Sequence, residues 1–172
     1  MSTLAPGAPG VIRTAAMPQR LFVALFVFLA AVAFAVAPLP LVVRSIGIVL
    51  CAYLGFSAAG MPAAYLTALL APPLGLIRGD QEWLIMLPII LSGNLLAMLG
   101  LEFAWRLPAI VVSPALLVAP ALLSWQLSSR PLFEVTLPWA GQETNWVALH
   151  VLAAVAGVLV ALFLDRRRAR TG

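Results

Sequence analysis

The chain has 172 residues, of which 63% are hydrophobic and only 9% are charged. A soluble domain is usually about 25% charged, so this chain has too few charges to cover a water-facing surface. The composition excludes a soluble enzyme, a disordered chain and a coiled coil. It predicts a single all-α, polytopic membrane domain. The net charge of +4 comes from Arg residues that form no continuous basic face, so we expect no nucleic-acid partner.

Six apolar stretches have, or nearly have, the length of about 20 residues that a membrane helix needs. In chain order they are 21–37, 41–59, 61–77, 82–103, 107–127 and 145–164. We therefore predict a flexible tail at 1–20, a six-helix membrane domain at 21–165 and a basic tail at 166–172. Ala35 and Ala37 also resemble a signal-peptide cleavage site, but the long apolar run and Pro38 favour a retained first helix.

The distribution of Arg predicts the orientation. Seven of the ten Arg fall on one side of a six-span chain, and three, Arg44, Arg78 and Arg130, fall on the other. Short cytoplasmic segments carry an excess of Arg, so both termini are expected in the cytoplasm, with the protein in the cell membrane. Arg44 is expected near the outer end of its helix, with its side chain extended to the interface.

The stretch 61–77 is the weakest of the six because Pro72 and Pro73 interrupt it. Two interpretations stay open: a kinked span that ends in an irregular segment, or a broken, re-entrant element. Asp80 precedes the next stretch and is expected to cap its N-terminus, with Glu82 in the first turn.

Asn94 is the polar side chain placed deepest in an apolar stretch. It can form a hydrogen bond between helices or contact a ligand. In the last stretch, Trp146 and His150 share a helical face with three small residues, Ala153, Gly157 and Ala161, which permit close helix packing.

Trp125, Glu143 and Asn145 are expected at the same outer end as Trp146 and His150. Two interpretations apply to this group: an interfacial aromatic belt, or an outward-facing pocket for a small molecule. His150 lies about one turn inside its helix, which favours the pocket. The pocket would be formed by Trp125, Glu143, Asn145, Trp146 and His150, with Asn94 as a further contact.

Enzyme chemistry and bound metals are not expected. The chain has one Cys, Cys51, and one His, His150, which excludes Cys-based and multi-His metal sites. No pair of acids lies within an apolar stretch, and nothing in the spacing links Cys51 to His150 as nucleophile and base. We predict no cofactor.

The C-terminal half resembles the substrate-binding S-components of energy-coupling factor (ECF) transporters. The resemblance is carried by PIILSGNLL at 88–96, SPALL at 113–117, and Asn145-Trp146 followed by AVAGVL at 154–159. It implies six helices with both termini inside and capture of a vitamin or similar micronutrient from outside. It also implies a membrane T-component and two ATPases as partners. The contact with the T-component would then correspond to Ala31 and Ala35 or to Ala33 and Ala37.

The leading hypothesis is therefore a membrane subunit that captures a small water-soluble solute for uptake. One alternative is a non-catalytic structural subunit of a larger complex, such as the cell-shape or cell-wall machinery. A stand-alone carrier is a further alternative.

Overall fold

The computed structural model describes residues 17–128, 138 and 142–171, and within them the side chains of 18–128, 138, 142 and 144–167. This part of the chain consists of helices and short connections, without a strand, so the all-α class is confirmed. The elements are α1 (Met17–Val36), α2 (Leu41–Ala59), α3 (Met61–Leu74), the 3-10 helix η1 (Gly75–Arg78), α4 (Gln81–Phe103), α5 (Ala109–Ser128) and α6 (Glu143–Thr171).

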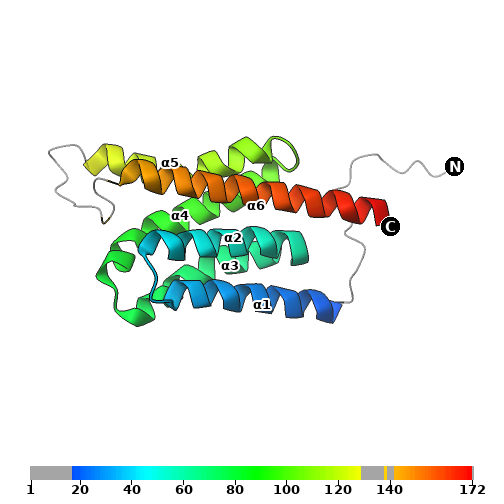
Figure 1. Cartoon of the computed structure of the whole chain (residues 1–172), viewed down its shortest axis with the longest axis horizontal. Coiled ribbons are helices and arrows are strands. Elements are labelled where there is room, and N and C mark those ends of the chain that lie inside the picture. The colour runs from blue at the N-terminus through cyan, green and yellow to red at the C-terminus, as the bar shows by residue number, and fades with distance from the viewer. Residues whose placement is uncertain (1–16, 129–137, 139–141, 172) are drawn as a thin grey trace.

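Successive helices run antiparallel and pack side by side, and α2 also contacts α6 (Figure 1). The bundle consequently has two ends. At the Asp80 end, α1 and α5 finish, α2, α4 and α6 begin, and η1 lies beside them. At the Arg20 end, α1 begins and α6 finishes (Figure 1).

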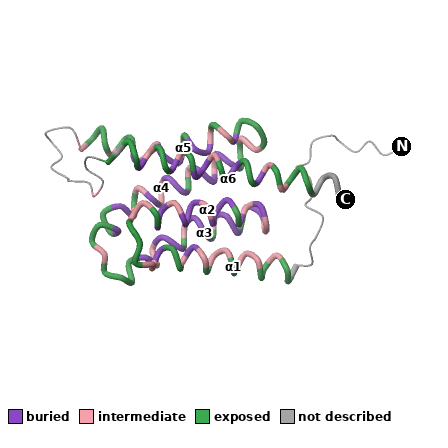
Figure 2. Tube along the Cα trace, viewed as in Figure 1, coloured by how far each residue is buried: buried purple, intermediate pink, exposed green. Residues whose placement is uncertain are grey.

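Five described helices are long and apolar enough to cross a membrane: α1, α2, α4, α5 and α6. Helix α3 has only 14 residues. Figure 2 shows that burial is greatest along α2 and small along α1, whose outer face exposes large apolar side chains such as Leu21, Phe22 and Phe26. These exposures suit a lipid environment better than water.

Two helices extend well beyond the predicted segments. Helix α1 begins at Met17, so residues 17–20 of the predicted tail are helical, and α6 continues to Thr171, so most of the predicted basic tail is helical. A run of apolar residues locates the membrane segment, but it does not show how far the helix continues into the polar residues on either side. Pro18 in the first turn suits a helix start, because an N–H there would have no helical acceptor.

Helix α3 lacks the irregular ending that the kinked-span interpretation expects. It continues through Pro72 and Pro73 to Leu74, and η1 follows directly. The tighter turns of η1 carry the chain to Gly79, whose positive φ of 68° ends the segment. The predicted cap at Asp80 is confirmed, since its carboxylate accepts hydrogen bonds from the backbone N–H groups of Glu82 and Trp83.

Small residues allow the helices to approach closely. A side chain at Gly157 would place its first carbon 2.6 Å from the ring of Tyr53 on α2. Of the other residues predicted to face a partner helix, Ala31 and Ala35 are fully buried, and Ala153 and Ala161 nearly so. In the structure, the neighbours of these small residues are helices of this same chain.

Candidate functional site

A small cavity of about 10 Å³ lies among α2, α4, α5 and α6, toward the Asp80 end. Its polar lining comes from Ser45 on α2, Asn94 on α4 and His150 on α6, beside the indole of Trp146. Apolar residues complete the wall: Ile89, Ile90, Leu117, Val118 and Ala121, together with Gly93. A space of about 10–15 Å³ accommodates one water molecule, so this cavity is water-sized.

The imidazole of His150 is held at both nitrogens. Its Nδ1 lies 2.8 Å from the carbonyl oxygen of Trp146, and its Nε2 lies 2.8 Å from Oγ of Ser45. A carbonyl only accepts, which assigns the proton to Nδ1, so in the neutral ring Nε2 accepts from the Ser45 hydroxyl. The Trp146 indole stacks on the imidazole with ring centroids 4.2 Å apart. Ser45 and Trp146 therefore fix both the orientation and the tautomer of His150.

The side chain of Asn94 replaces a backbone hydrogen-bond donor that is missing at Pro72. In a helix, the N–H of residue 72 would donate to the carbonyl of Ala68, but Pro72 has no N–H. The side-chain amide of Asn94 donates to that carbonyl at 3.0 Å, and both residues are buried. Of the two roles open to Asn94, the hydrogen bond between helices is thus observed, and the same side chain also lines the cavity.

Replacing Asn94 with Leu is expected to lower the free energy of unfolding by about 1 kcal/mol. Hydrogen bonds between membrane helices contribute about 0.6 kcal/mol on average. A buried polar group left without a partner costs about 1–3 kcal/mol, so we expect a loss at the lower end of that range. Pro72→Ala restores a backbone N–H for the Ala68 carbonyl, so the double variant should lose less than Asn94→Leu alone. Reversible unfolding of all four proteins in mixed micelles measures this coupling. Strictly additive losses would contradict the assignment.

The helices that face His150 across the cavity contain prolines. Pro88 lies one residue before Ile89 in α4, and Pro114 and Pro120 flank Leu117 and Val118 in α5. Each proline removes one helical hydrogen bond and creates a point at which the helix can bend. The cavity therefore has one wall, α2 and α6, that carries the Ser45–His150 hydrogen bond, and a facing wall of kinkable helices.

The structure brings three of the six predicted binding residues together: Asn94, Trp146 and His150. Trp125 and Asn145 are exposed and do not line the cavity, and the side chain of Glu143 lies outside the described residues. The sequence analysis missed Ser45. A serine near the start of an apolar helix commonly bonds to the backbone of its own helix, so its sequence context does not mark it as a site residue. Its partner His150 lies 105 residues away in the sequence.

Arg44 forms a second polar cluster at the Asp80 end. Its guanidinium donates to the Ala35 carbonyl through Nε at 2.9 Å and Nη2 at 2.5 Å, and Nη1 lies 2.6 Å from the Asp80 carboxylate. It also stacks 4.0 Å from the centroid of the Trp83 ring. The expectation that Arg44 extends to the interface is wrong: it is 1% exposed, because partners on α1 and at the start of α4 enclose its charge.

The Asp80 carboxyl responds to the same contacts. Partial burial raises its pKa, but hydrogen bonds from Arg44 and from the backbone N–H groups of Trp83 and Glu82 outweigh this effect and hold the pKa below its ordinary value. Asp80 is therefore ionised near neutral pH and remains paired with Arg44. We assign this cluster to stability, because its groups bond to one another and to backbone carbonyls.

A hydroxyl bonded to an imidazole nitrogen is also the geometry of a nucleophile and its general base. Here the second ring nitrogen bonds to the Trp146 carbonyl instead of a carboxylate, and both Ser45 and His150 are buried beside a water-sized space. Both ring nitrogens of His150 are occupied, so the groups that can still bond to a small polar guest are the Ser45 hydroxyl oxygen and the Asn94 amide.

Comparison with known proteins adds no identification to this geometry. No protein family, no curated protein and no solved structure matches this chain.

Proposed function

We propose that this chain is a membrane-embedded subunit that captures a small water-soluble solute at the cavity formed by Ser45, Asn94, Trp146 and His150. The supporting observation is the convergence of three polar side chains from three helices on one buried space beside an indole face. Polar groups inside a membrane domain are costly, so their convergence around a space favours a binding role. The solute class is a vitamin or similar micronutrient, as in ECF S-components.

Binding of such a solute requires the cavity to expand. The Pro88 segment of α4 and the Pro114–Pro120 segment of α5 can bend away from α6, while Ser45 and His150 stay joined across α2 and α6. The solute would then stack on Trp146, donate a hydrogen bond to Oγ of Ser45, whose hydroxyl His150 orients, and bond to the Asn94 amide.

The proposed topology has six crossings with both termini in the cytoplasm of the cell membrane. The 14 residues of α3 and four of η1 together extend about 29 Å at about 1.5 and 2.0 Å per residue, close to the hydrocarbon thickness of about 30 Å. The Asp80 end would then face outward. Movement of the solute would be powered by partner subunits of the T-component and ATPase type.

The binding test uses the full chain in nanodiscs, with a panel of water-soluble vitamins as probes in equilibrium dialysis. Ser45→Ala and His150→Gln should each weaken binding of the retained vitamin about tenfold, the effect of about 1.4 kcal/mol for one hydrogen bond. Ser57→Ala is the matched control. Ser57 is also a buried serine of α2, but it lies 12 residues away, about 18 Å along the helix, and bonds to the Tyr53 carbonyl. Equal affinities in Ser45→Ala and Ser57→Ala would contradict this site.

A second candidate is a structural membrane subunit without a ligand. The water-sized volume of the cavity favours it, because every polar lining group already has a hydrogen-bond partner in the closed bundle. Purification under mild conditions separates the two. Co-purification with ATPases supports solute uptake, and co-purification with cell-wall synthesis proteins supports the structural role.

A further inference from the structure

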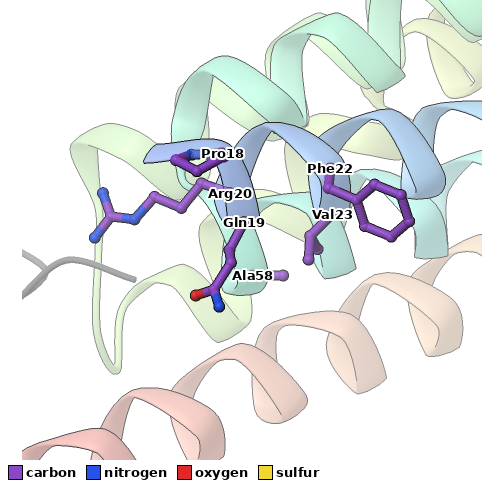
Figure 3. A pocket seen from close by; sticks show the side chains of 6 residues that line it. All are labelled: Pro18, Gln19, Arg20, Phe22, Val23 and Ala58. Carbon is purple, nitrogen blue, oxygen red and sulfur yellow. The ribbon is translucent and has the colours of Figure 1, made fainter. Parts of the chain in front are cut away.

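A groove of about 490 Å³ lies at the Arg20 end of the bundle, between the start of α1 and the end of α2 (Figure 3). Among the described residues, six line it: Pro18, Gln19, Arg20, Phe22, Val23 and Ala58. Figure 3 shows the polar ends of Gln19 and Arg20 at one end of the groove and the Phe22 ring at the other. The groove thus changes from charged to apolar along its length.

The depth of the groove in the membrane follows from the helix ends. Arg20 is the fourth residue of the membrane helix α1, and Ala58 is the second-last residue of α2. The charged end of the groove therefore lies where a membrane helix meets the polar headgroups, and Phe22 and Val23 lie one step deeper, at the level of the first acyl carbons. This order matches the order of chemical groups in a phospholipid.

The charge at the Arg20 end of the bundle, where the groove lies, favours an anion. At the Arg20 end, the described side chains include four Arg, at 20, 106, 166 and 167, against two acids, Glu102 and Asp165. At the Asp80 end, the described charges balance, with Arg44 and Arg78 against Asp80 and Glu82. An excess of Arg beside a membrane surface attracts anionic headgroups.

The dimensions of the groove disfavour a partner helix. Along the described part of α1 its wall runs from Pro18 to Val23, about 8 Å at 1.5 Å per residue, whereas a transmembrane helix packs along most of the bilayer thickness of about 30 Å. Its volume falls within the range of about 300–1,000 Å³ that is usual for small-ligand sites. We propose that the groove binds one anionic diacyl phospholipid, with its phosphate at Arg20 and Gln19 and the start of one acyl chain along Phe22, Val23 and Ala58.

The test is native mass spectrometry of the full chain released from nanodiscs that contain phosphatidylcholine and a minor fraction of phosphatidylglycerol. The wild type is expected to retain phosphatidylglycerol in preference to phosphatidylcholine. Arg20→Gln should reduce this preference about fivefold, which corresponds to about 1 kcal/mol for one basic residue near an anionic headgroup. Arg106→Gln is the matched control, because it removes the same charge at the same end from an exposed residue outside the groove.

A second variant tests the apolar half of the groove. Ala58→Leu fills the space beside Val23 while Arg20 keeps its charge, and it should reduce retention of phosphatidylglycerol. The proposal is overturned if Arg20→Gln and Arg106→Gln retain equal amounts of phosphatidylglycerol, or if Ala58→Leu retains as much as the wild type. It is also overturned if soluble glycerol phosphate displaces the lipid, since the site would then recognise the headgroup alone. None of these outcomes depends on the solute cavity.

Discussion

Arg44→Met is expected to destabilise the protein by about 3 kcal/mol, the lower end of the range of about 3–5 kcal/mol for removing one partner of a buried ion pair. The variant removes two hydrogen bonds to the Ala35 carbonyl, the ion pair with Asp80 and the stacking on Trp83. The Asp80 side chain is 27% exposed, so water recovers part of its lost solvation, and this places the expected value at the lower end. Reversible unfolding in mixed micelles measures the loss.

Two further proteins separate charge from packing. Arg44→Met/Asp80→Asn should be more stable than Arg44→Met, because no uncompensated carboxylate remains and Asn still caps α4. Arg78→Ala is the control: its guanidinium bonds to the Ala37 carbonyl at an exposed position, so its loss should cost less than about 1 kcal/mol. If Arg44→Met and Arg78→Ala lose equal stability, Arg44 does not hold α1, α2 and α4 together.

The pH dependence of the unfolding free energy tests the contact between Arg44 and Asp80 independently. Because the folded protein holds the pKa of Asp80 below its ordinary value, the contribution of Asp80 to stability is present above the unfolded-state value of about 3.9. It is lost as the pH falls through the lower, folded-state value. The unfolding free energy of the wild type should therefore decline in this acid range, and the decline should be smaller in Arg44→Met.

The sequence predicts those parts of the fold that depend on local chemistry. Runs of apolar residues locate the helices, and the position of Asp80 before such a run predicts its cap. The position of the Arg44 side chain cannot be predicted from local sequence. In a membrane protein, an arginine near a helix end can extend to the interface or pair with a buried partner, and the partner Asp80 lies 36 residues away. Only the packing of α4 against α2 decides between them.

The candidate site likewise combines features that the local sequence predicts with features that depend on helix packing. Pro72 removes the N–H that would bond to the Ala68 carbonyl, so the need for another donor can be read from the sequence. The identity of that donor, Asn94, depends on how α3 and α4 align. Trp125 shows the opposite case: it shares an end of the bundle with Trp146, but helical rotation exposes it while Trp146 is buried. Sequence spacing gives depth in the membrane more reliably than direction toward the core.

The approach of α4 to α5 depends on Gly93, and Gly93→Ala is expected to lower the unfolding free energy by about 1–2 kcal/mol. A methyl group at this position would lie 2.5 Å from the carbonyl oxygen of Leu117, which is backbone and cannot rotate away. Overpacking costs about 1–3 kcal/mol, and the better helix propensity of Ala returns about 0.5–1 kcal/mol. Equilibrium unfolding of the variant in mixed micelles measures the net loss.

Gly55→Ala is the matched control, because it changes another glycine inside a helix at a site where the new methyl group would lie 3.4 Å from the Ala63 backbone, an ordinary contact. It should leave the stability unchanged or raise it by up to about 1 kcal/mol. Equal effects of the two substitutions would show that helix propensity, and not contact with α5, governs position 93. The substitution also bears on the cavity, because Gly93 lines it opposite His150.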